Sequence, residues 1–96
     1  GAVAGLAPTL AALAERRVDT LVVSHGFEAP GWRCITCDSL RDLGPRCPSC
    51  DAAMELVDDV VGDAVGLALA RSCDVALVRG NADLDVLGRV GALLRF

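Results

Sequence analysis

Four cysteines in two closely spaced pairs are the residues of this chain with the clearest capacity for chemistry. Two residues lie within each pair and nine lie between the pairs, which gives Cys34, Cys37, Cys47 and Cys50. Two intervening residues let both thiolates of a pair point at one ion from a tight turn, and two such turns supply the sulfur tetrahedron that suits Zn²⁺. Because four thiolates leave no open coordination position, we expect one structural zinc per chain and no metal-bound catalytic water.

Two other interpretations of these cysteines stay open, a dithiol redox pair and unliganded thiols. The redox interpretation fits less well, because neither pair opens an expected helix that would lower a thiol pKa. Disulfides fit poorly too, since the five cysteines are an odd number and the first residues lack the charged region of a secretory signal. Residues 31–51 contain few large apolar side chains, so a metal would supply the free energy that orders them.

The other residues capable of chemistry are explained more simply by structure. His25 is the only histidine, and its place beside the cysteine-bearing segment favours a hydrogen-bonded loop residue over a metal ligand. Cys73 precedes an apolar run and is expected to be a small core residue. The adjacent Asp58 and Asp59 resemble a catalytic pair only superficially, because acidic residues are favoured where a helix begins.

The apolar periodicity predicts helices and short buried strands around the cysteine segment. Helices are expected over residues 6–17 and 58–71. A third helix is expected from Asn81, which would cap it, and would carry Leu84, Leu87 and Val90. Strands are expected at 19–24, 54–57, 75–79 and 92–96, the second returning the chain to the core. This order predicts an α/β domain with mainly parallel pairing. Residues 1–30 and 52–96 would form one core, and 31–51 an inserted four-cysteine zinc-ribbon subdomain, with Trp32 packing where the two meet.

Length and charge limit the classes of function. With 96 residues the chain is expected to form one domain, and no apolar run approaches the length that a bilayer requires. The formal net charge is −4, every basic residue is an arginine, and only Arg16 and Arg17 are adjacent. Since phosphate binding along a nucleic acid needs clustered cations, the sequence argues against direct nucleic-acid binding. We expect a cytoplasmic protein without membrane contact.

Several stretches of the sequence resemble a known family. They are ALAERRVDTLVVSHGF, the CxxC pairs, VDDVVGDAVGLALA, DVALVRG and the closing LGRVGALLRF. Together they resemble the C-terminal domain of archaeal and eukaryotic-type peptide chain release factors, and the release-factor-like proteins of bacteria more closely still. The chain departs from the family pattern where Asp38 and Asp51 follow the cysteine pairs in place of glycine, and at Arg89, where glycine is common. Aspartate tolerates the left-handed backbone that such a turn often needs.

The resemblance implies a three-layer α/β/α domain similar to the ribosomal kink-turn-binding fold, carrying an inserted zinc ribbon. It also implies a function: a non-catalytic protein-interaction domain acting in translation termination or ribosome rescue, with a translational GTPase or another ribosome-associated factor as partner. In the family, peptidyl-tRNA hydrolysis belongs to a Gly-Gly-Gln loop in another domain, so no enzymatic activity is expected here. The alternative function is an RNA-binding module of the kink-turn-protein type, which the acidic charge disfavours.

Overall fold

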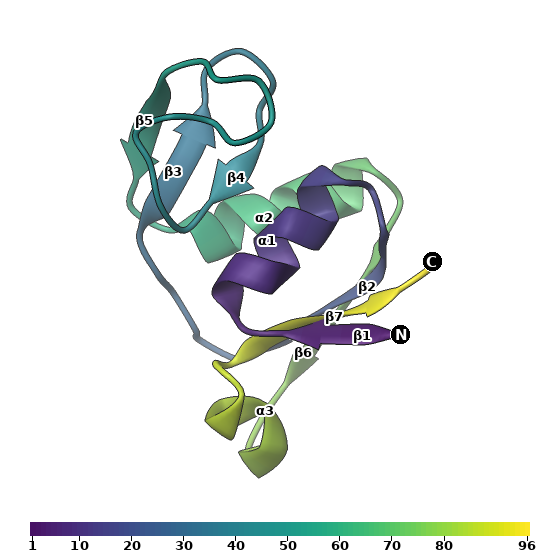
Figure 1. Cartoon of the computed structure of the whole chain (residues 1–96). Helices are drawn as coiled ribbons and strands as arrows, with labels where there is room; N and C mark the ends of the chain where they lie inside the picture. Colours follow the sequence, from purple (N-terminus) through teal and green to yellow (C-terminus); the bar gives the residue numbers. More distant parts are fainter.

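A four-stranded mixed sheet forms the base of the molecule in the computed structural model, which describes all residues from 1 to 96 (Figure 1). Its strands are β1 (Ala2–Ala4), β2 (Val18–Ser24), β6 (Asp74–Val78) and β7 (Val90–Leu94), in the order β1-β7-β2-β6. β2 and β6 are parallel, whereas β7 runs antiparallel to both of its neighbours. The prediction of mainly parallel pairing was therefore wrong, because only one of the three strand pairs in this sheet is parallel.

Two helices, α1 (Leu6–Ala14) and α2 (Val60–Ala70), cover one face of this main sheet (Figure 1). The apolar side chains of both helices and the alternate residues of β2 and β7 meet in one core. Its most deeply buried members are Leu10, Leu13, Val18, Leu21, Val60 and Ala68. The longest helix has 11 residues, and no helix combines the length and the apolar character needed to span a membrane.

The second face of the main sheet carries only the short helix α3 (Ala82–Val86). Leu84 of this helix approaches Gly91 on the face of β7 opposite to the buried Val90 and Ala92. The third layer that the resemblance implies is thus reduced to one and a half turns. Leu87 and Leu93 stay half-exposed on this side, at 56% and 50%.

A second, three-stranded antiparallel sheet stands apart from the first, beyond α1 and α2 (Figure 1). It consists of β3 (Gly31–Cys34), β4 (Leu40–Arg41) and β5 (Met54–Val57), in the order β4-β3-β5. β4 lies against both helices, and its buried Leu40 belongs to the main core. We call these residues, 31–57, the small sheet.

Most expected elements are present, and four details of the expectation were wrong. The first helix ends at Ala14 because Arg16 adopts a left-handed backbone, with φ of 58°. Residues 54–57 are a strand, but they pair with β3 in the small sheet and not with the main core. The third helix ends at Val86, so that Val90 opens the last strand. The short strand β1 was not expected at all.

Asp59 confirms the structural interpretation of the Asp58–Asp59 pair. Its carboxylate caps α2 by accepting a hydrogen bond from the backbone N–H of Val61 at 3.1 Å. The same oxygen accepts from the N–H of Ala29 at 3.3 Å, which ties the start of α2 to the segment that leads into the small sheet. Asp58 is exposed and adjacent, and so offers a matched comparison.

Replacing Asp59 by alanine is expected to lower the free energy of unfolding by about 1–2 kcal/mol, because an orphan helix N–H loses its acceptor. Asp58→Ala removes the same charge without a cap and should change stability by less than about 0.5 kcal/mol. Urea midpoints at unchanged m-value measure both effects. Equal losses from the two variants would contradict the capping role.

Candidate metal centre

The two cysteine pairs lie in two turns with the same pattern of backbone hydrogen bonds. Cys34 is the last residue of β3, and its N–H donates to the carbonyl of Ser39 at 2.9 Å. Cys47 repeats this contact with the carbonyl of Ala52, also at 2.9 Å. Such turns bring both cysteines of a pair to the same side of the backbone, as a shared ion would require.

A left-handed aspartate closes each of these turns. The N–H of Asp38 donates to the carbonyl of Cys34 at 3.2 Å, and the N–H of Asp51 donates to that of Cys47 at 2.8 Å. Their φ values are 63° and 65°, in the region that glycine adopts freely and aspartate tolerates. The structure therefore confirms the left-handed turns predicted at these two positions.

The four sulfurs converge on one point. All lie within 4.8 Å of one another, with Cys34 and Cys50 Sγ atoms 3.4 Å apart and Cys37 and Cys47 Sγ atoms 3.6 Å apart. Zn–S bonds of about 2.3 Å in a tetrahedron place the sulfurs about 3.8 Å apart. Cys34 and Cys47 are buried, whereas Cys37 and Cys50 face solvent. No cysteine is in a disulfide, and this cluster could hold a metal ion.

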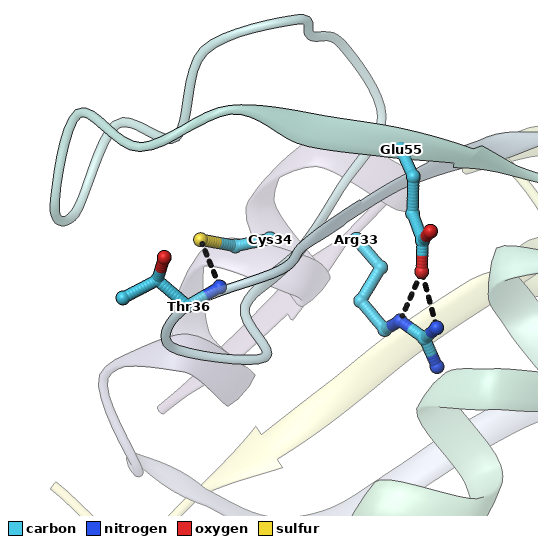
Figure 2. A network of polar contacts seen from close by, with 4 residues as sticks. All are labelled: Arg33, Cys34, Thr36 and Glu55. Atoms are coloured by element: carbon cyan, nitrogen blue, oxygen red, sulfur yellow. Dashed lines mark hydrogen bonds and ion pairs between the residues drawn. The ribbon is translucent and has the colours of Figure 1, made fainter.

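Backbone N–H groups point at the buried sulfur of Cys34. Those of Thr36 and Cys37 both lie 3.4 Å from its Sγ atom, and Figure 2 shows the first of these contacts. These two donors are placed to meet the negative charge that a metal-bound sulfur would carry.

Without a metal, the surroundings of Cys37 and Cys50 shift the pKa values of these two thiols in opposite directions. The hydroxyl of Ser39, 3.2 Å from Cys37 Sγ, and then its backbone N–H lower the pKa of Cys37 to about 6. At Cys50 the N–H of Ala52 favours the thiolate, but the neighbouring sulfur of Cys34 and burial outweigh it and raise the pKa to about 12. Four adjacent thiolates therefore need a cation among them. The donor set fits a dication that accepts soft sulfur ligands, as Zn²⁺ does.

Only a few apolar residues pack near the sulfurs. Met54, Trp32 and Ala52 contact Cys34 and Cys47 in a cluster separate from the main core. The prediction that Trp32 packs where the cysteine segment meets the core was wrong, because the indole lies against the sulfurs and over Gly44. A side chain at Gly44 would overlap this ring. Trp32 thus belongs to the support of the cysteine cluster.

A surface ion pair joins β3 to β5 beside this cluster. Arg33 and Glu55 stand directly opposite each other in the sheet register. Nε of Arg33 donates to Glu55 Oε1 at 3.1 Å, and the guanidinium reaches the same oxygen with a second N–H (Figure 2). This hydrogen bond, and then the charge of Glu55, raise the pKa of Arg33. Because both side chains are half-exposed, the pair aligns the strands more than it stabilises them.

The remaining candidates lie away from the cysteine cluster. Cys73 is buried in the main core, where its thiol donates to the carbonyl of Val18 at 3.3 Å, as expected for a structural residue. His25 is exposed, and its Nε2 lies 3.1 Å from a guanidinium nitrogen of Arg79. Gly88, expected within a helix, instead follows α3 with φ of 103°. Arg89 comes next and is also left-handed, with φ of 66°.

Comparison with solved structures shows a likeness that covers nearly the whole chain. The chain is similar in structure to the C-terminal domain of peptide chain release factor from Methanosarcina mazei, with a TM-score of 0.64 and 24% sequence identity. The match covers 99% of this chain and 69% of that chain. No protein-family model and no curated protein matches the sequence. The resemblance predicted from the sequence is confirmed as a likeness of fold, that of a small mixed α/β domain.

Proposed function

We propose that this chain is a non-catalytic protein-interaction domain of a release-factor-like protein, acting in the cytoplasm in translation termination or ribosome rescue. The observation that carries the proposal is the likeness, over nearly the whole chain, to the C-terminal domain of an archaeal release factor. Its partner would be a translational GTPase or another ribosome-associated factor. Within the proposal, α3 is a reduced third layer of a fold related to the kink-turn-binding proteins.

The proposed metal is one structural zinc held by Cys34, Cys37, Cys47 and Cys50, the set whose sulfurs lie within 4.8 Å of one another. When bound, it supplies a cross-link and no reactive position, because four thiolates complete its coordination. The cysteine turns of residues 31–51 would then form an inserted ribbon subdomain. Its task is to keep β3, β4 and β5 together and seated on α1 and α2.

Affinity capture from a lysate of the source organism tests the proposed function. The chain, tagged at one end, should recover a translational GTPase or ribosomal components, identified by mass spectrometry. Recovery of neither class would contradict the proposal. A gel shift with ribosomal RNA at low salt separates the alternative, because a phosphate-binding module must lose affinity steeply as salt rises.

Two exposed leucines, one beside the second face of the main sheet and one on α2, provide a matched pair of variants for this capture experiment. Leu87, 56% exposed, lines an apolar cavity of 280 Å³ formed with β1 and β7, whereas Leu69, 60% exposed, lies on α2 outside that cavity. An apolar surface of this kind is typical of protein contacts. Leu87→Glu should reduce partner recovery while Leu69→Glu preserves it.

A further inference from the structure

A polar cavity of 320 Å³ lies at the edge of the main sheet where its parallel strands end. β2 and β6 run side by side, with Val23 opposite Leu77 and Ser24 opposite Val78, and both chains then turn away. Open α/β sheets bind ligands outside the carboxyl ends of such strands. The lining residues come from the β2 end, the β6 end and the α3–β7 connection: Ser24, His25, Gly26, Phe27, Val78, Arg79, Gly80, Asp85 and Arg89.

Positively charged side chains outnumber negatively charged ones around this cavity. Asp85 is the one carboxylate that lines it, and it accepts a hydrogen bond from the Ser24 hydroxyl at 3.0 Å. Arg79 and Arg89 both line it, and neither takes part in any of the three ion pairs of the chain.

Neighbouring contacts anchor both arginines. The guanidinium of Arg79 donates to Nε2 of His25 at 3.1 Å, which makes this imidazole nitrogen an acceptor. The backbone of Arg89 is fixed on both sides, because its N–H donates to Leu84 at 2.8 Å and its carbonyl accepts from Ser24 at 2.9 Å. Its φ of 66° lies in the left-handed region, which is disfavoured for a residue with a Cβ atom.

We propose that this cavity binds a phosphate group. Guanidinium forks match the oxygens of a phosphate with paired hydrogen bonds, and two of them face one cavity. An apolar ligand is disfavoured, since only Phe27 and Val78 among the lining residues are apolar. The group belongs either to a small phosphorylated molecule or to one phosphate of an RNA chain. This site is distinct from the cysteine cluster and does not depend on the protein partner proposed above.

Titration of the ¹⁵N-labelled chain with inorganic phosphate, at ionic strength held constant with chloride, tests the proposal. Amide signals of Gly26 and Gly80 and the side-chain Nε–H signals of both cavity arginines should shift and saturate. Arg79→Gln and Arg89→Gln should each weaken phosphate binding by about tenfold, the loss of one charge-assisted contact. Arg17→Gln is the control, since it removes the same charge from an arginine that lines none of the cavities and should preserve the affinity.

Three results would overturn the site: shifts that stay linear with phosphate, shifts scattered over the surface, or an equal loss in Arg17→Gln. The rest of the amide spectrum shows whether each variant is folded. If a glutamine variant is not folded, Arg79→Lys, which keeps the charge, should still retain part of the affinity for phosphate. Competition then separates the two sources. If a nucleoside monophosphate and a short RNA displace inorganic phosphate equally well, the ligand is a small phosphorylated molecule. If the RNA displaces it more strongly, the ligand is a phosphate of a nucleic acid. Displacement by neither contradicts the proposal.

Discussion

Replacing Cys47 by serine should release the zinc and unfold the small sheet, while the main sheet stays folded. Cys47 is 2% exposed and belongs to a cluster of only three buried residues, Cys34, Cys47 and Met54. Each fully buried side chain contributes about 1.5–3 kcal/mol. Binding of a structural zinc contributes an apparent free energy of about 10–16 kcal/mol to the folding of a small peptide. This is roughly twice the contribution of three fully buried side chains. The expectation rests on the zinc proposed above.

The fifth cysteine supplies the control for this variant. Cys73 is also buried, but it lies in the main core and donates to the carbonyl of Val18, a contact that a serine hydroxyl can keep. Elemental analysis should find one zinc per chain in the unaltered protein and in Cys73→Ser, and less than a tenth of that in Cys47→Ser. Hydrogen exchange should show loss of protection at the amides of Cys34, Cys47 and Met54 in Cys47→Ser alone.

If the amides of the small sheet stay protected from hydrogen exchange in the absence of metal, the structural role of zinc is contradicted. The same measurement separates the interpretations that the sequence leaves open. A dithiol pair predicts an ordered, metal-free protein whose thiols reduce disulfides, and unliganded thiols predict order with neither metal nor redox activity. The proposed zinc site predicts that order in the small sheet and metal content are lost together.

The sequence predicts those features of the fold that depend on local chemistry. Two residues between cysteines and an aspartate after each pair define the two cysteine turns, because a tight turn limits both reach and backbone angle. The apolar period of α2 and its acidic cap at Asp59 locate that helix within two residues. The cavity proposed to bind phosphate was not predicted, since Arg79 and Arg89 are ten residues apart and only the pairing of β2 with both β6 and β7 brings them together.

Tertiary pairing explains the errors in the same way. Met54–Val57 has the pattern of a strand in sequence, but nothing in four residues says whether its partner is β3 or the main sheet. β1 has three residues, too few to show a period of two, and it is a strand because β7 offers it a free edge. Trp32 was predicted where the cysteine segment meets the core, whereas the residues around Cys34 and Cys47, together with Gly44, provide its contacts.

Gly31 marks where the small sheet meets the main core. It is the first residue of β3, it is buried, and it lies against the first residue of α2, Val60, which is fully buried. A Cβ atom at Gly31 would lie 2.6 Å from Val60 Cβ and 2.8 Å from the carbonyl oxygen of Arg41 in β4. Neither neighbour can rotate away, because one is the stem of a packed side chain and the other is backbone. The close approach of β3 to α2 and β4 therefore requires glycine.

Gly31→Ala is accordingly expected to lower the free energy of unfolding by about 1–3 kcal/mol through overpacking. Gly66→Ala is the matched control, since a Cβ there meets nothing within 4 Å and lies inside α2. It should raise stability by about 0.5–1 kcal/mol, because alanine favours helix more than glycine does. Urea unfolding of both variants with zinc bound measures the difference, and unchanged zinc content in Gly31→Ala would place the strain at the junction and not at the cysteines. If Gly31→Ala were as stable as Gly66→Ala, the small sheet would not be seated on α2 as closely as these contacts require.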